Sequence, residues 1–169
     1  MVIAGEHEDI ELWLERRRVR GQDHADEVWE GVYHAAPNAP SWHGRAAIEV
    51  MFALRGSAEQ AGLVSCAEFN LGTAQDYRVP DGGWLEQAAP AALYVPTAVA
   101  ILEVLSPGDE SYAKLGFYAR HGVREAIFVD PLQQAVHCWK LDGPTAASEE
   151  SHSAVFAVDV DALSRLISW

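Results

Sequence analysis

The feature that most constrains the fold is one acid inside an otherwise apolar segment, residues 97–105. A segment that is apolar on both of its faces is typical of a central strand covered by other elements on both sides. Glu103 alone interrupts it. An ionised carboxylate buried in such a strand costs several kcal/mol unless another group compensates its charge. The sequence therefore predicts a covered sheet whose central strand carries a compensated acid.

Two explanations of Glu103 stay open at this point. In the first, the strand ends at Glu103, and the carboxylate meets solvent or an arginine. In the second, the carboxylate binds a divalent cation, which makes a buried negative charge tolerable. A second acid is needed to choose between them.

That second acid is Asp81, which follows the strand-like segment Tyr77-Arg78-Val79-Pro80 and precedes two glycines. Taken alone, Asp81 is a turn aspartate at the end of a strand. If its strand pairs beside that of Glu103, the two carboxylates converge, and one of them takes up a proton unless a metal neutralises the pair. Hard carboxylate oxygens completed by waters suit Mg²⁺ or Mn²⁺.

The rest of the sequence predicts an α/β fold, a mixed central sheet with helices packed against it. Apolar residues at intervals of three and four predict a long helix that begins at its N-cap Ser41 and ends at Gly62. A second helix is expected over residues 110–121, capped by Asp109 or Ser111, and Asp161 is expected to cap a closing helix. Strands are expected within residues 26–34 (a hairpin), 63–69, 77–79, 97–105, 126–129, 135–141 and 154–160, with a turn around Asp81-Gly82-Gly83.

The size of the chain favours one domain. At 169 residues, 49% hydrophobic and 22% charged, it matches ordinary globular domains. We expect a single domain over residues 1–169, with residues 1–25 as an N-terminal helical extension. Residues 142–153 are polar, and we expect them to form a mobile loop.

The sequence gives no sign of export or membrane insertion. The N-terminal residues lack the hydrophobic segment of a secretory signal, and the longest apolar run, residues 91–102, is interrupted by Pro96 and too short to cross a bilayer. We therefore expect a cytoplasmic protein with no membrane contact. In that compartment Cys66 and Cys138 are expected to be buried reduced thiols, and neither a disulfide nor a zinc site.

The formal net charge of −13 at pH 7 bears on the class of partner. DNA is a polyanion, and unaided binding to it draws much of its affinity from lysine and arginine. The chain has 12 such residues against 25 acids, so the charge limits affinity for nucleic acid. It does not constrain the fold.

Six short motifs follow one another in a defined order between residues 26 and 141. They are Glu27-Val28-Trp29-Glu30-Gly31, Val79-Pro80-Asp81, Leu102-Glu103-Val104-Leu105-Ser106-Pro107, Lys114 with Tyr118-Ala119, Gly122-Val123-Arg124-Glu125 and Val129-Asp130-Pro131. Each motif is short, and their shared order and spacing carry the match. Together they resemble the Uma-type restriction endonuclease family of the PD-(D/E)XK nuclease superfamily.

This resemblance implies a restriction-endonuclease-like core in which two acids on neighbouring strands hold a metal ion. Asp81 and Glu103 match those acids, and the Val104 backbone carbonyl matches a further metal ligand. The superfamily lysine, two residues after the second acid, is Leu105 here. In the Uma-type pattern a lysine from the following helix replaces the superfamily lysine, and Lys114 matches that position. The alternative interpretation of Lys114 is a solvated lysine on the surface of the helix.

Two further residues match family positions as accessory members of the site. Glu27 precedes the early glycine of the family pattern and either lines the metal pocket or is a solvated acid of the hairpin. His43 matches a histidine at the start of the long helix and is either catalytic or structural.

The resemblance implies Mg²⁺- or Mn²⁺-dependent hydrolysis of DNA phosphodiester bonds, with Asp81, Glu103 and Lys114 as catalytic residues. Two alternatives stay open. One is a catalytically inactive binding or assembly module that keeps the nuclease fold, which Leu105 and the acidic charge favour. The other is a self-associating scaffold. A homodimer is compatible with both leading interpretations, and DNA is the expected partner.

Overall fold

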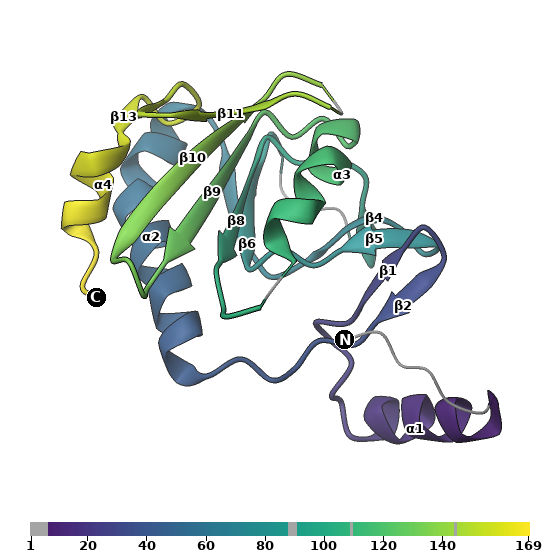
Figure 1. Cartoon of the computed structure of the whole chain (residues 1–169). Coiled ribbons are helices and arrows are strands. Elements are labelled where there is room, and N and C mark those ends of the chain that lie inside the picture. The colour runs from purple at the N-terminus through teal and green to yellow at the C-terminus, as the bar shows by residue number, and fades with distance from the viewer. Residues whose placement is uncertain (1–6, 88–90, 109, 144) are drawn as a thin grey trace.

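The computed structural model describes residues 7–87, 91–108, 110–143 and 145–169. Its main element is a six-stranded sheet, which lies at the centre of Figure 1. The strand order is β11-β10-β9-β8-β6-β3, in which β8 and β9 are parallel and every other pair is antiparallel. The expected α/β fold with a mixed sheet is confirmed. The strands are β3 (Val64–Ala67), β6 (Gly82–Leu85), β8 (Ala100–Val104), β9 (Glu125–Asp130), β10 (Ala135–Leu141) and β11 (Ala147–Glu150).

A second sheet, of five short strands, stands beside the first in the order β2-β1-β5-β4-β7 (Figure 1). Its β1–β2 hairpin turns through Glu30 and Gly31, both at positive φ, as in a type I′ turn. The expected hairpin is therefore confirmed. The strands are β1 (Glu27–Trp29), β2 (Val32–His34), β4 (Asn70–Thr73), β5 (Asp76–Arg78) and β7 (Tyr94–Val95), and a separate pair is formed by β12 (His152–Ser153) and β13 (Val158–Asp159).

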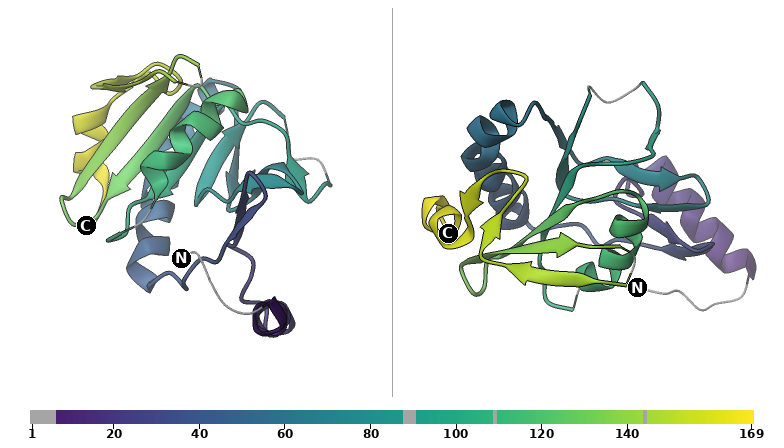
Figure 2. Two further views of the ribbon diagram at one scale, coloured as in Figure 1. Left: turned by 45° about the vertical axis from the view of Figure 1, so that its right-hand side comes forward. Right: turned by 90° about the horizontal axis from the view of Figure 1, so that it is seen from above.

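Helices cover both faces of the six-stranded sheet, which makes its central strand a buried one (Figure 2). Ala100, Leu102 and Val104 of β8 share one apolar cluster with α2 and α4, whereas Ile101 belongs to a second cluster with α3. Because side chains alternate along a strand, Glu103 points to the same side as Ile101. The helices are α1 (His7–Val19), α2 (Ser41–Gln60), the 3₁₀ helix η1 (Ser111–Lys114), α3 (Leu115–Arg120) and α4 (Val160–Leu166).

The expected turn around Asp81-Gly82-Gly83 is wrong in its second half. Gly82 and Gly83 belong to β6, a strand that pairs with both β3 and β8 in the middle of the sheet. A Cβ atom at Gly83 would lie 2.9 Å from the Ala100 carbonyl oxygen and 3.0 Å from the Phe69 ring. Close packing, and not a turn, therefore explains the glycine.

The expected helix caps are also corrected. Pro40 occupies the N-cap of α2 and Ser41 is its first residue, while the cap of α4 is Asp159, whose carboxylate accepts from the Ala162 N–H, in place of Asp161. Glu110 occupies the N-cap of η1 in place of Ser111, which is the first residue of η1 and donates its hydroxyl to Glu103. The alternative cap, Asp109, lies outside the described residues. Gly62 ends α2 at a φ of +71°, as expected.

The polar stretch 142–153 is not a loop throughout. β11 pairs with the end of β10, and β12 follows directly. The strand expected over residues 154–160 is reduced to β13, because residues 154–157 form a turn. Cys66 and Cys138 are both free thiols; Cys138 is buried as expected, whereas Cys66 is only partly buried. Of the described helices, none combines the length and the apolar character that a membrane span requires.

Gly83→Ala should destabilise the protein by roughly 1–3 kcal/mol, because the added methyl group overpacks a closed interior. Gly56 is the matched control, since a Cβ there meets nothing within 4 Å. In the interior of α2, Gly56→Ala should stabilise by about 1 kcal/mol through helix propensity. Urea unfolding of both variants measures the two effects. Equal stability of both variants would contradict the packing explanation of Gly83.

Candidate functional site

Asp81 and Glu103 meet through the pairing of β6 with β8. The antiparallel register places Gly82 opposite Leu102 and Gly83 opposite Ile101. Continued by one residue, it sets Asp81 opposite Glu103, and directly opposed residues point to the same face of a sheet. The Val104 N–H donates to Asp81 Oδ2 at 2.7 Å, which fixes the aspartate at the end of β8.

Glu103 is buried, with 4% of its surface exposed, and three donors from one helical segment surround its carboxylate. Lys114 Nζ lies 3.1 Å from Oε1, the Tyr118 hydroxyl donates to the same oxygen, and the Ser111 hydroxyl donates to Oε2 at 3.5 Å. Positions i, i+3 and i+7 lie on one face of a helix. The segment η1–α3 therefore presents this face to the acid.

Glu27 forms the other side of the site. It is 5% exposed and accepts the Val79 N–H at 2.8 Å and the Trp29 indole N–H at 2.6 Å. Lys114 Nζ lies 2.9 Å from Glu27 Oε1, so a single ammonium bridges Glu27 and Glu103. Both solvated interpretations, of Glu27 as a hairpin acid and of Lys114 as a surface lysine, are wrong.

The electrostatics of this cluster follow from burial and from an excess of acid. Burial raises the pKa of Glu103 to about 7; Lys114 opposes that rise, and Asp81 and Glu27 add to it. Burial lowers the pKa of Lys114, but Glu103 and Glu27 outweigh it, so the pKa of Lys114 is raised and the ammonium stays charged. Burial and Glu103 raise the pKa of Tyr118 far above its usual value, so its hydroxyl remains a neutral donor.

His43 and Leu105 complete the surroundings of the two acids. His43 lies in the first turn of α2, and its Nε2 is 3.5 Å from Asp81 Oδ2. Leu105 packs on the apolar cluster of α3. Leu105 has no charge to offer Glu103, and the positive charge beside this acid is the ammonium of Lys114 in η1.

The donor set fits a small, hard cation. Within residues 7–87, 91–108, 110–143 and 145–169, no group of three or more His, Cys, Asp or Glu side chains is arranged to hold a metal ion. Mg²⁺ needs less, because it is commonly bound through one or two carboxylates with waters in the remaining positions. Asp81 and Glu103 offer two carboxylates on neighbouring strands, and both Asp81 and Glu27 raise the pKa of Glu103, as negative charges gathered around it do.

The sequence analysis did not single out Tyr118 or Ser111 as members of the site. Tyr118 entered only as part of the motif around Lys114, and Ser111 only as a candidate helix cap. The available signal was their spacing from Lys114, which puts all three polar groups on one face of an otherwise apolar helical segment.

The comparisons with known proteins identify this α/β domain as nuclease-like. The family model Uma2, described as "Putative restriction endonuclease", matches residues 7–163, and the chain belongs to this family. A solved structure, a "putative nuclease belonging to DUF820 from Anabaena variabilis ATCC 29413", is similar with a TM-score of 0.67. It shares 17% sequence identity over 86% of this chain and 93% of its own, which shows a common fold. No curated protein matches the sequence.

Glu103→Gln should change how stability depends on pH. Folding raises the pKa of Glu103 from 4.5 to about 7, so the folded state holds this proton more tightly than the unfolded state between those values. The resulting contribution to stability is complete below the lower value and is lost as pH rises through the upper one, a change of roughly 3 kcal/mol. Glu103→Gln has no carboxyl proton to lose at this position, so its stability should not fall in this way between about pH 4.5 and about pH 8.

Urea unfolding in EDTA at about pH 4.5 and about pH 8 measures the difference. Glu86→Gln, at an exposed carboxylate, is the control and should follow the wild type. If Glu103→Gln followed it too, burial would not control the protonation of Glu103.

Proposed function

We propose that this chain is a divalent-metal-dependent endonuclease that hydrolyses phosphodiester bonds of DNA. The observation that carries the proposal is the buried cluster in which Asp81 lies beside Glu103 and Lys114 bridges Glu103 and Glu27. Membership of a restriction endonuclease family supports it. A buried acid with a raised pKa beside a buried lysine, as Glu103 lies beside Lys114, is typical of catalytic sites.

Asp81 and Glu103, with the Val104 backbone carbonyl, are the groups that would hold Mg²⁺ or Mn²⁺. When bound, such an ion polarises a phosphate and lowers the pKa of a water molecule. Lys114 would orient the attacking water or offset the negative charge that develops on the phosphate.

The remaining residues act as positioning residues. Tyr118 and Ser111 fix the Glu103 carboxylate by hydrogen bonds. Glu27 holds the Lys114 ammonium by an ion pair, and its own carboxylate is fixed by the Val79 N–H. His43 lies beside Asp81 and steadies its side chain. Because these partners belong to different elements, the site is organised by the tertiary fold.

A catalytically inactive module with the same fold is the second candidate. Leu105 at the position of the superfamily lysine and the net charge of −13 favour it. Calorimetric titration with Mg²⁺ and Mn²⁺ separates the candidates before any substrate is chosen. Binding that Glu103→Gln abolishes supports the enzyme, and no binding leaves the inactive module.

Asp81→Asn and Glu103→Gln should each lower cleavage of supercoiled plasmid DNA by about 100-fold or more, because each removes a carboxylate that holds the ion. EDTA should abolish the wild-type activity. Asp161→Asn, at an exposed carboxylate of α4, is the matched control and should cleave like the wild type. Equal cleavage by all four proteins would reject the assignment of the site.

The C-terminal end of α1 is the most basic segment of this acidic chain. Arg16, Arg17, Arg18 and Arg20 make up four of its 12 lysines and arginines. Arg17 is anchored to Asp26, and the other three are exposed. In Figure 1 and the left view of Figure 2, α1 lies toward the same end of the molecule as the first turn of α2 and the loop after β8. This end is where we expect the DNA backbone to bind.

Arg16→Gln/Arg20→Gln should weaken DNA binding and lower the slope of log affinity against log salt by about 2, because each phosphate contact releases counterions. Arg124→Gln/Lys140→Gln removes two charges where β9 begins and β10 ends. That end lies opposite the C-terminal end of β8, so this control should keep the wild-type slope. Fluorescence anisotropy with Ca²⁺ in place of Mg²⁺ measures both. Equal slopes for the two variants would remove α1 from the binding surface.

A further inference from the structure

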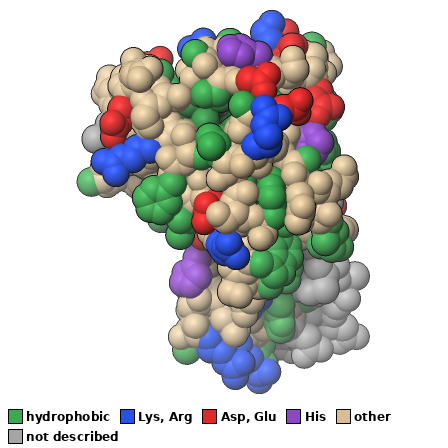
Figure 3. Space-filling view, turned by 90° about the vertical axis from the view of Figure 1, so that its left-hand side faces the viewer, with side chains coloured by type: hydrophobic (Ala, Val, Ile, Leu, Met, Phe, Trp, Pro, Cys, Tyr) green, Lys and Arg blue, Asp and Glu red, His purple; other side chains and the backbone are tan. Residues whose placement is uncertain are grey.

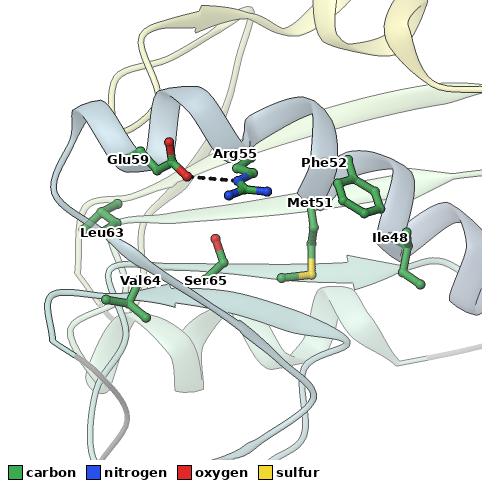
Figure 4. Close-up of a pocket in the computed structure, with 8 residues that line it drawn as sticks. All are labelled: Ile48, Met51, Phe52, Arg55, Glu59, Leu63, Val64 and Ser65. Carbon is green, nitrogen blue, oxygen red and sulfur yellow. Dashed lines mark hydrogen bonds and ion pairs between the residues drawn. The ribbon is translucent and has the colours of Figure 1, made fainter.

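α2 and β3 enclose an apolar groove that is separate from the candidate site. Its volume is about 500 Å³, and Met51 projects from α2 toward β3, which carries Val64 and Ser65 (Figure 4). In the view from the side of α2 and α4, hydrophobic side chains interrupt the polar surface (Figure 3). The groove is lined by Ile48, Met51, Phe52, Arg55, Glu59, Leu63, Val64 and Ser65.

Several large apolar side chains of this groove are exposed to solvent instead of packing in the core. Phe52 is 70% exposed and Ile48 56%, one turn apart on α2, while Val50 and Leu54 of the same helix are fully buried. Val64 of β3 adds a third apolar side chain at 39%. Single apolar side chains scattered over a protein surface are ordinary, whereas a cluster of them marks a contact surface.

β3 continues this surface as a sheet edge. It is the last strand of the six-stranded sheet and, among the described strands, pairs with β6 alone. Proteins usually protect an edge with lysine, proline or a bulge. The sequence of β3, Val64-Ser65-Cys66-Ala67, has no charged residue and no proline. Another strand can therefore pair with it.

The charges of the groove are balanced, in contrast to the chain as a whole. Arg55 Nε lies 2.9 Å from Glu59 Oε1, and the two side chains are 70% and 65% exposed. A two-fold axis between two copies brings each surface against itself, so Arg55 of one copy can meet Glu59 of the other twice. Most acidic surfaces of a chain with charge −13 would repel their own copies. This one is self-complementary.

We propose that this face, formed by the exposed side of α2 and the free edge of β3, binds a second copy of the chain about a two-fold axis. Phe52 and Ile48 of each copy fill the groove of the other. Arg55 and Glu59 form reciprocal ion pairs at its rim. The interface lies apart from Glu103 and Lys114, so it does not depend on the proposed catalytic activity.

Light scattering after size exclusion tests the proposal at about 50 µM protein, a load at which a specific dimer is populated. The wild type should have twice the 18.5 kDa mass of one chain. Phe52→Glu should be monomeric, and Leu132→Glu, at a 76% exposed leucine outside the groove, should remain dimeric. Circular dichroism establishes that both variants are folded. A monomeric wild type overturns the proposal, and so does a dimer that Phe52→Glu leaves intact.

A charge exchange tests the two-fold arrangement itself. Arg55→Glu and Glu59→Arg should each weaken the dimer about tenfold or more, because like charges then meet across the axis. The double variant Arg55→Glu/Glu59→Arg restores opposite charges and should dimerise like the wild type. A double variant as weak as either single one overturns the reciprocal pairing.

Discussion

The bridge that Lys114 makes between Glu27 and Glu103 is the interaction on which the rest of the site depends. It joins β1 of the small sheet, β8 of the large sheet and η1 through one ammonium group. Removing one partner of a buried ion pair typically costs about 3–5 kcal/mol, because the other charges stay buried without compensation. The Lys114 bridge therefore holds the two sheets together and also sets the geometry of the site.

The sequence predicted the centre of the fold and missed its surroundings for definable reasons. The apolar segment around Glu103 identified β8, because a strand covered on both faces has an unmistakable pattern. β6 was missed because Gly82 and Gly83 favour turns locally, and the packing of Phe69 and Ala100 that requires glycine is a tertiary contact. The match to the Uma2 family confirms the resemblance carried by the ordered motifs.

The candidate site shows the same division between local and long-range information. The sequence proposed Asp81, Glu103 and Lys114, and the structure brings them together. The environments of Glu27 and Lys114 could not be predicted, because the two residues are far apart in the sequence and form their buried ion pair only in the folded chain. Tyr118 depended on the same fold, since its hydroxyl gains a partner only when α3 packs on β8.

The gathering of three acids links the structure to the proposed chemistry, because Asp81 lies opposite Glu103 on the neighbouring strand, and Glu103 shares the Lys114 ammonium with Glu27. The most direct measurement is anomalous scattering from a crystal soaked in Mn²⁺. The account predicts one manganese peak within bonding distance of carboxylate oxygens of both Asp81 and Glu103. A peak bound to neither acid, with Lys114 still bridging Glu27 and Glu103, would contradict it.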